Sequence, residues 1–410
     1  MKNKKDYELA VIIEPLFEND NEEEKTAEIE ALLDASGAKL FLTVKQKIRE
    51  INPGTIIGRG KLEEIKNIIS ENEVDLVVFD GELSPSQQNN VSDVLEVKVI
   101  NRTSLILDIF AMRARSPEGK ILVELAQLKY IYPRLSGKGL SLSRLGGGIG
   151  TRGPGETKLE TDRRHIKSKI RSLEKSLNEI EKRRQMQQFR REKNGVKTIA
   201  LVGYTNTGKS TLINILSGSD LLAKDQLFAT LDPSARKAHI DGYQVVIFDT
   251  VGFIKQLPPD LMEAFKSTLE CAVCADLVLN VCDISDNWYM QTETTVRTLN
   301  ELGVTAPIIT VYNKCDLVCD ENACGKNSVS ISAKTGRGID ELKKKIVDVL
   351  FSDLIDKRYT ISYTRNFNPL KLRDLCEKYS ITYSDDNIIA DVRVSEKNLP
   401  NLEKYILNTK

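Results

Sequence analysis

The 410-residue chain is poor in histidine and tryptophan, with two histidines and one tryptophan. His165 and His239 provide little material for a Ser–His–Asp triad or for a metal site built on imidazoles. No apolar run approaches the roughly 20 residues that a membrane-spanning helix requires. The sequence therefore argues against histidine-based hydrolases and metalloenzymes, and it predicts no membrane span.

Cysteine is also sparse: seven cysteines are scattered along the chain without a repeating spacing. A disulfide framework needs an even, regularly spaced set, so we expect the protein in the reducing cytoplasm. Cys271 and Cys274 have the CxxC spacing of a zinc-ligand pair, but no second pair or nearby histidine completes the set. We interpret them as core residues and keep a metal site as the alternative.

The length of the chain predicts several domains, because single cores rarely exceed roughly 250 residues. We predict a multidomain α/β protein, and we expect it to be a monomer. Its four expected parts are a small parallel α/β domain at 1–108, an antiparallel coiled-coil-like helical arm at 109–195, a larger α/β domain at 196–355 and a small α/β domain at 356–410.

The two larger α/β parts alternate apolar runs with amphipathic stretches, which is the βαβ pattern of parallel sheets. In the part that begins at 196, the expected strands are 197–203, 237–249, 276–283, 306–313 and 328–333. Short strands with helical pieces between them are expected in the last part, at 358–364, 380–384 and 387–394.

The arm carries two apolar stripes with the alternating 4,3 spacing of helices that pair along a seam. The stripes consist of Ile121, Leu125, Leu128, Tyr132 and Leu135, and of Ile166, Ile170, Leu173, Leu177 and Ile180. Pairing with each other is the simplest way for the two helices to bury both seams. The second helix, from about 156 to 193, would be roughly 55 Å long at 1.5 Å per residue.

A glycine-rich basic loop at 136–157 joins the two helices. Its glycines suit either a linker or a backbone that lies against a ligand. Arg144 and Arg152 lie in this loop, and the basic excess continues into the second helix through Arg163 and Arg164. The local positive charge favours a polyanionic partner, and the absence of an aromatic residue in the loop favours phosphate contacts over base stacking. A solvated helix face is the alternative interpretation.

Residues 203–210 (GYTNTGKS) match the phosphate-loop pattern GxxxxGK[ST] between an expected strand and an expected helix. The N–H groups of such a loop face the β-phosphate, Lys209 bridges the β- and γ-phosphates, and Ser210 binds magnesium. The motif predicts a nucleoside triphosphate but does not identify the base.

Two further segments are expected at the γ-phosphate. Residues 249–252 (DTVG) follow an expected strand, and they would place the Asp249 carboxylate beside the metal through water and the Gly252 amide against the phosphate. Thr230 is the best candidate for the mobile-loop threonine that closes on Mg²⁺. The expected magnesium set is Ser210, Thr230 and Asp249.

Residues 313–316 (NKCD) identify the base as guanine. Asp316 can accept hydrogen bonds from N1–H and the 2-amino group of guanine, whereas adenine would leave this carboxylate without a partner. Residues 332–334 (SAK) would supply a backbone N–H for guanine O6. The expected site for GTP or GDP comprises Gly203, Asn206, Thr207, Gly208, Lys209, Ser210, Thr211, Phe228, Thr230, Asp249, Gly252, Asn313, Lys314, Asp316, Ser332, Ala333 and Lys334.

The catalytic residues are not identified by the sequence. Ras-like proteins place a water-orienting glutamine directly after the DxxG glycine, where this chain has Phe253, and a phenyl ring cannot orient water. We therefore expect slow hydrolysis by the protein alone and stimulation by a partner. Asn206 resembles the asparagine of potassium-stimulated GTPases, which makes K⁺ a further candidate cofactor.

Taken together, these motifs resemble the HflX family, in the Obg–HflX group of bacterial P-loop GTPases. The resemblance rests on Gly146–Arg164 (GGGIGTRGPGETKLETDRR), on FATLDP and DTVGFI, and on Phe79–Asn90 (FDGELSPSQQNN). It implies a Ras-like G domain and binding to the large (50S) ribosomal subunit. It also implies ribosome-stimulated GTP hydrolysis and the splitting or rescue of stalled or idle ribosomes under stress. The residues that it directs at ribosomal RNA are Arg144, Gly147, Gly148, Arg152, Arg163 and Arg164.

Other interpretations stay open beside this one. A regulatory GTPase switch could act through protein partners, with the arm as an adaptor. An accessory GTPase of RNA modification would need a modification-domain cysteine or a folate site, which the sequence does not show. The resemblance also raises ATP binding by the N-terminal domain, but Gly58 and Gly60 fit no phosphate loop and favour a turn before a helix.

Overall fold

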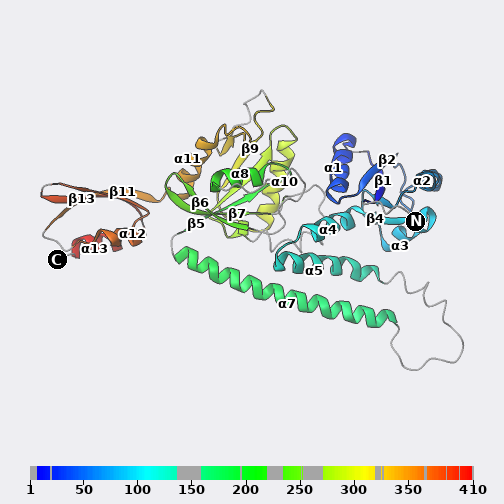
Figure 1. Ribbon diagram of the computed structural model, residues 1–410, viewed down its shortest axis with the longest axis horizontal. Helices are drawn as coiled ribbons and strands as arrows, with labels where there is room; N and C mark the ends of the chain where they lie inside the picture. Colours follow the sequence, from blue (N-terminus) through cyan, green and yellow to red (C-terminus); the bar gives the residue numbers. More distant parts are fainter. Residues whose placement is uncertain are drawn as a thin grey trace. The chain divides into compact units, whose positions relative to one another are not determined.

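The computed structural model describes residues 7–18, 21–135, 158–193, 196–218, 234–250, 252, 271–318, 325, 327–363, 367–384, 386–396 and 398–408. The chain forms two compact units, one chiefly of residues up to Gln187 and one chiefly of the residues after it. Figure 1 shows the helices and strands of both units and labels most of them. The expected multidomain α/β fold is confirmed, and each unit is described separately below.

A four-stranded parallel sheet with the order β2-β1-β3-β4 forms the centre of the first unit. Its elements are β1 (Leu9–Leu16), α1 (Glu22–Ala35), β2 (Lys39–Lys47), α2 (Arg59–Asn72), β3 (Leu76–Phe79), α3 (Pro85–Leu95), β4 (Lys98–Asn101) and α4 (Arg102–Arg113). Gly58 caps α2, so a turn before a helix is what this glycine provides. The predicted small parallel sheet is confirmed.

Helices cover both faces of this sheet because successive side chains of a strand point to opposite sides. Ala10 and Ile12 of β1 belong to a core formed with α1 and α4. Val11 and Ile13 of the same strand belong to a second core, formed with α2 and α3. The apolar run at the start of the chain is therefore a strand that is buried on both faces.

The helical arm consists of α5 (Pro117–Arg134) and α7 (Lys158–Lys193), which run side by side in Figure 1. Tyr132 near the end of α5 lies against Arg163 near the start of α7, whereas Glu118 at the start of α5 pairs with Arg184 at 2.7 Å. Because the end of α5 contacts the start of α7 and the start of α5 contacts the second half of α7, the predicted antiparallel pair is confirmed. The apolar stripe of α7, from Ile166 to Ile180, is half-buried along its length.

Helix α5 has a second apolar face that the sequence analysis did not assign. Val123, Ala126 and Tyr130 are buried in the core that α1 and α4 share. Helix α5 therefore packs on α7 with one face and on the N-terminal core with another. Residue 108, where the sequence analysis placed the end of the N-terminal domain, lies within α4.

A six-stranded sheet with the order β10-β9-β8-β5-β7-β6 forms the larger part of the second unit. All neighbouring strands are parallel except β6 and β7. The elements are β5 (Lys197–Val202), α8 (Lys209–Ser217), β6 (Ser234–Ile240), β7 (Tyr243–Asp249), β8 (Leu277–Asp283), α10 (Trp288–Glu301), β9 (Ile308–Asn313), β10 (Ser328–Ser330) and α11 (Ile339–Leu350).

The structure corrects one expected strand, because residues 237–249 do not form a single strand. Asp241 and Gly242 have φ angles of 48° and 89° and form the two-residue turn of a hairpin between β6 and β7. Asp-Gly is a strong signal for such a turn, because both of its central residues need positive φ. This sequence signal was present in the expected strand.

A three-stranded antiparallel sheet with the order β11-β13-β12 ends the second unit. Its elements are β11 (Leu354–Ser362), α12 (Leu372–Leu375), β12 (Lys378–Tyr383), β13 (Asn387–Ser395) and α13 (Leu399–Asn408). Alternate residues of β13 are buried against α13, which leaves the opposite face of the sheet to solvent. The predicted small C-terminal α/β domain is confirmed. Among the described helices, none is long and apolar enough to cross a membrane.

Candidate nucleotide site

The expected nucleotide-site motifs follow neighbouring parallel strands of the six-stranded sheet. The phosphate loop follows β5, Asp249 ends β7, and Asn313 ends β9. Because β9, β8, β5 and β7 are successive neighbours in the sheet, the carboxyl ends of these strands lie at one edge. Ligands of open α/β sheets bind at such an edge.

The phosphate loop has a backbone that requires its glycines. Gly203 has a φ of 144°, and a Cβ atom there would collide with the carbonyl of Val281 in β8. Gly208 has a φ of 88°, and a Cβ atom there would collide with the side chain of Asn313. Asn206 has a positive φ of 61°, which asparagine tolerates better than most residues. Close packing from two neighbouring strands therefore fixes the loop before α8 begins.

Lys209 at the start of α8 points back into the phosphate loop. The residue is 7% exposed, and its Nζ donates to the carbonyl oxygen of Gly203 at 3.0 Å and to that of Tyr204. Burial lowers the pKa of Lys209 to about 8, against a smaller opposing effect of the Asp249 carboxylate. An anion in the loop would compensate this buried cation, which is what a polyphosphate supplies.

Asp249 and Thr250 place the end of β7 beside the phosphate loop. Asp249 is 1% exposed, and the Thr250 hydroxyl donates to the carbonyl of Leu201 in β5 at 2.6 Å. Ser210 and Thr211, in the first turn of α8, are half-buried. The buried Asp249 carboxylate therefore lies at the same edge of the sheet as the first turn of α8, which carries Lys209 and Ser210.

Asn313 connects the phosphate loop to the loop at 332–334. Its Nδ2 donates to the carbonyl of Thr207 at 2.8 Å, and its Oδ1 accepts from the backbone N–H of Ala333 at 2.9 Å. The sequence analysis assigned Asn313 to nucleotide binding but did not predict this bridge. The bridge aligns two loops whose contacting residues are 106 and 20 residues away from Asn313 along the chain.

Lys314 and Asp316 directly follow β9, at the same edge of the sheet as the phosphate loop. Lys314 pairs with Asp283, at the end of β8, at 2.5 Å, and Asp283 also accepts from the Ser285 hydroxyl at 2.6 Å. Asp316 is exposed, and a hydrogen bond with Ser332 is the main cause that lowers the pKa of its carboxyl group. An ionised, accessible carboxylate is the group that guanine recognition needs. Asp283 was not among the predicted site residues, although its place at a strand end next to the motif strand was a usable signal.

Several expected site residues lie outside the described residues. These are Phe228, Thr230 and Phe253 of the nucleotide site, and Arg144, Gly147, Gly148 and Arg152 of the arm loop. Arg163 and Arg164 are described: Arg163 is half-buried with its guanidinium 5.3 Å from the Tyr132 ring centre, and Arg164 is exposed. Cys271 is half-buried and Cys274 is exposed, so the interpretation of both as core residues is wrong for Cys274. Within the described ranges, no group of three or more His, Cys, Asp or Glu residues could hold a metal ion.

Three family models match successive parts of the chain. They are described as the GTP-binding GTPase N-terminal region at residues 23–111, the GTP-binding GTPase middle region at 113–191, and the 50S ribosome-binding GTPase at 198–314. The matched ranges cover the parallel sheet except β1, the helical arm, and the six-stranded sheet except β10. The order of the three models is the order of these parts in the chain.

Curated relatives match along most of the chain. GTPase HflX of Caldanaerobacter subterraneus is 47% identical over 374 residues, which cover 90% of this chain and 87% of the relative. GTPase HflX of Escherichia coli is 40% identical over 357 residues, which cover 85% of this chain and 84% of the relative. Among solved structures, a GTP-binding protein of Sulfolobus solfataricus in complex with GDP is 24% identical, with 84% of this chain and 99% of that chain covered and a TM-score of 0.47.

The identity to these relatives extends beyond the nucleotide motifs to the N-terminal sheet and the arm. The family model over the six-stranded sheet begins at the first residues of β5 and ends just after Asn313. The chain therefore belongs to the HflX family of ribosome-binding GTPases, and it hydrolyses GTP.

Proposed function

We propose that the loops at the carboxyl edge of the six-stranded sheet bind GTP through the residues that the motifs predict. The phosphate-loop amides and Lys209 hold the phosphates, Asp316 accepts from guanine, and the loop at 332–334 donates to O6. The buried Lys209 ammonium and the ionised, accessible Asp316 carboxylate support these roles. Gly203, Asn206, Thr207, Gly208, Thr211, Phe228, Gly252, Asn313, Lys314, Ser332, Ala333 and Lys334 complete the proposed nucleotide set.

Magnesium would be held by Ser210, by Asp249 through water and by Thr230, and it would neutralise charge on the β- and γ-phosphates. Phe253 cannot orient the attacking water, so hydrolysis depends on a group that a partner or a cation supplies. We propose Asn206 as a ligand of K⁺, because it resembles the asparagine of potassium-stimulated GTPases. Equal GTP turnover in Na⁺ and K⁺ buffers of the same ionic strength would rule this role out.

The partner that we propose is the large ribosomal subunit, contacted through the arm. The family description and the surface charge of α7 support this proposal. At about 100° per residue, one face of α7 carries a stripe of exposed cations, which we call the basic stripe. It consists of Arg164, Lys167, Arg171, Lys175 and Lys182.

The basic stripe lies opposite the face that packs on α5, where the half-buried Ile166, Leu173 and Ile180 lie. Ion pairs to α5 involve other residues of α7: Glu174 pairs with Lys129 at 3.1 Å, and Arg184 pairs with Glu118 at 2.7 Å. The stripe extends about 27 Å along the helix. A row of cations of this length suits contacts with several phosphates of a nucleic-acid backbone.

The ribosome proposal is tested by co-sedimentation of the full chain with purified 50S subunits over a series of KCl concentrations. Replacing Lys167, Arg171 and Lys175 by Gln should weaken binding and reduce the slope of log affinity against log salt by about two to three. The matched control keeps the charge: Lys167→Arg, Arg171→Lys and Lys175→Arg should bind like the wild type. Unchanged binding by the Gln variant would refute the stripe as a phosphate contact.

At the level of the cell, we propose that GTP binding and hydrolysis are coupled to the splitting or rescue of stalled or idle ribosomes under stress. GTP would favour the ribosome-bound form, and hydrolysis would release the factor. The resemblance to the HflX family supports this step. Light scattering of 70S ribosomes should fall when the protein is added with a non-hydrolysable GTP analogue and should stay unchanged with GDP.

A regulatory switch that acts through protein partners is the second candidate. The half-buried apolar seam between α5 and α7 would then serve as a coiled-coil adaptor, and the cations would only keep the arm solvated. Under this alternative, alanine at Arg144, Arg152, Arg163 and Arg164 leaves RNA and ribosome affinity unchanged.

A further inference from the structure

The hairpin of β6 and β7 connects two distant places in the second unit. At one end, Ser234 of β6 lies opposite Asp249 of β7, the carboxylate proposed for magnesium. At the other end, Ile240 lies opposite Tyr243, next to the turn. The two ends of β7 are about 20 Å apart at roughly 3.3 Å per residue. Because β7 is hydrogen-bonded to β5 on one side and to β6 on the other, it behaves as a stiff connection.

The turn end of this connection is held by the C-terminal part of the chain. Tyr243 is 4% exposed and stacks on Phe351, which caps α11, with ring centroids 4.2 Å apart. Its hydroxyl oxygen accepts a hydrogen bond from Nη1 of Arg393 in β13 at 2.8 Å. Residues from three elements therefore meet at the first residue of β7.

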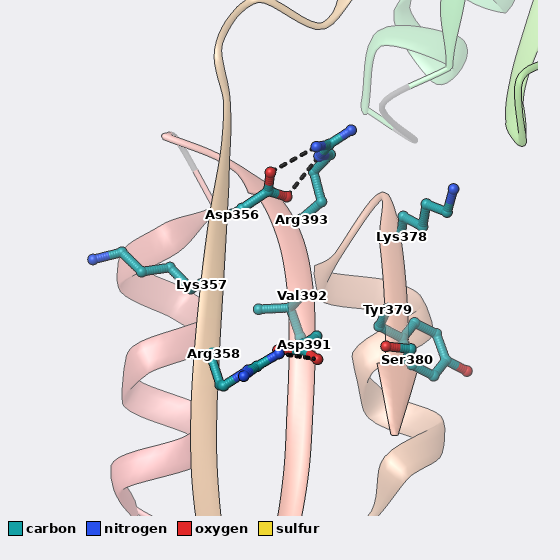
Figure 2. A pocket seen from close by; sticks show the side chains of 9 residues that line it. All are labelled: Asp356, Lys357, Arg358, Lys378, Tyr379, Ser380, Asp391, Val392 and Arg393. Carbon is teal, nitrogen blue, oxygen red and sulfur yellow. Dashed lines mark hydrogen bonds and ion pairs between the residues drawn. The ribbon is translucent and has the colours of Figure 1, made fainter. Parts of the chain in front are cut away.

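Arg393 is itself fixed in place by a second partner. Its Nε and Nη2 donate to the two carboxylate oxygens of Asp356 in β11, each at 2.6 Å, and Figure 2 shows this pair bridging the two strands. The bond with Asp356 is also the main cause that raises the pKa of the guanidinium. A planar guanidinium held at two nitrogens presents the third in a defined direction. In this structure that direction is the Tyr243 hydroxyl.

We propose that Tyr243 and Arg393 are positioning residues for the nucleotide site. The Arg393–Tyr243 bond fixes the turn end of β7, and the stiffness of β7 carries this restraint to Asp249 at the other end. The inference rests on the proposed role of Asp249 at magnesium. Since coupling between two sites is reciprocal, the C-terminal sheet and the nucleotide influence each other through this strand.

A matched control lies on the same sheet. Arg358 of β11 pairs with Asp391 of β13 through Nε at 2.5 Å and Nη2 at 3.1 Å, two positions along the strand from the Asp356–Arg393 pair. Figure 2 shows both ion pairs on one face. Within the described residues, the Arg358 pair links only β11 and β13. A variant of Arg358 therefore removes a similar ion pair without touching β7.

The experiment measures the release of fluorescent mant-GDP from the full chain with Mg²⁺ and with excess EDTA. Tyr243→Phe removes the hydroxyl and keeps the stacking on Phe351, and Arg393→Gln removes the donor. With Mg²⁺, each variant should release GDP about fivefold faster than the wild type, and the double variant should be no faster than either. In EDTA all variants should match the wild type, because the effect acts through Asp249. Arg358→Gln should match the wild type in both conditions.

Failure of the positioning role can be distinguished from failure of the proposed magnesium site. If EDTA does not accelerate release from the wild type, the proposed magnesium role fails. If EDTA accelerates it but Tyr243→Phe and Arg393→Gln remain within about twofold of the wild type in Mg²⁺, the positioning role is refuted. An effect that persists in EDTA, or that Arg358→Gln shares, likewise refutes it, since these results would indicate a general loss of structure.

Discussion

At the scale of single residues, the fold buries the ammonium group of Lys209, a residue that is 7% exposed. Burial lowers the pKa of Lys209 to about 8 in the nucleotide-free protein. Phosphates beside the ammonium would favour its charged form and raise this pKa again. Nucleotide binding should therefore take up protons near pH 8, and affinity should fall as the pH rises above about 8.

Proton uptake by Lys209 is measurable by titration calorimetry of GDP binding in buffers that differ in ionisation enthalpy. At pH 8, where the free lysine is about half protonated, binding should take up about half a proton, and at pH 7 it should take up much less. Lys209→Arg is the control, since a guanidinium stays charged and has no proton to gain. Equal uptake by this variant would assign the proton to another group.

Asp316 is expected to determine which base the site accepts. With Asp316→Asn, an amide N–H faces the donors of guanine, so affinity for GDP should fall by about 100-fold or more. Xanthine has a carbonyl oxygen in place of the 2-amino group, and XDP should bind this variant better than GDP does. Competition against a fluorescent nucleotide checks both statements, with Asp340→Asn on the exposed first turn of α11 as the control. Retained GDP preference in Asp316→Asn would contradict the assignment.

At the scale of secondary-structure elements, α5 depends on a polar anchor at the end of the N-terminal sheet. The Tyr130 hydroxyl donates to Oδ1 of Asn101 at 2.6 Å and accepts from the Ser104 hydroxyl at 3.1 Å. Arg134 stacks on the Tyr130 ring 3.5 Å from its centre, and its Nη2 lies 3.7 Å from Glu82. These contacts attach one helix of the arm to the end of β4, to the first turn of α4 and to the loop that follows β3.

Removing the Tyr130 hydroxyl should loosen α5 without changing its apolar packing. Tyr130→Phe loses one buried and one partly buried hydrogen bond, so local opening should become easier by about 1–2 kcal/mol. Hydrogen exchange of the α5 amides should accelerate by a factor of about 5–30. Tyr132→Phe, on the face towards α7, is the control and should change exchange little. Equal exchange in both variants would show that the anchor does not stabilise the helix.

The order of the elements could be read from the sequence because it follows from short-range patterns. Apolar runs buried on both faces indicate parallel strands, and the 4,3 spacing of α7 from Ile166 to Ile180 indicates a helix with one partner. Helix α5 is apolar on two faces, and spacing alone does not say which face meets which neighbour. The partners of Val123, Ala126 and Tyr130 lie in the N-terminal core, so this contact depends on the tertiary structure.

The same limit applies to the candidate site. The glycines, Lys209 and Asp316 were predictable because each is required by a local motif. The Asn313 bridge, the Asp283–Lys314 pair and the Arg393–Tyr243 bond each join residues from different motifs or from none. Such contacts depend on which strands become neighbours. The sequence predicted the strands but not these pairings.

At the scale of the whole molecule, charge is separated although the chain is neutral, with 59 basic and 59 acidic residues. The basic stripe of α7 concentrates exposed cations on one face of the arm. The residues of the GTP site, in contrast, belong to the motifs of the six-stranded sheet. Because Phe253 occupies the usual glutamine position, we expect turnover to be slow without an activating partner. The account therefore predicts that the partner contacted by the arm controls turnover.

The most direct test is GTP turnover by the full chain alone, with purified 50S subunits and with 70S ribosomes. The same series is repeated with alanine at Arg144, Arg152, Arg163 and Arg164. The account predicts slow turnover alone, strong stimulation by 50S subunits, and loss of this stimulation in the variant while its basal turnover persists. Turnover that 50S subunits do not raise, or stimulation that survives all four substitutions, would contradict it.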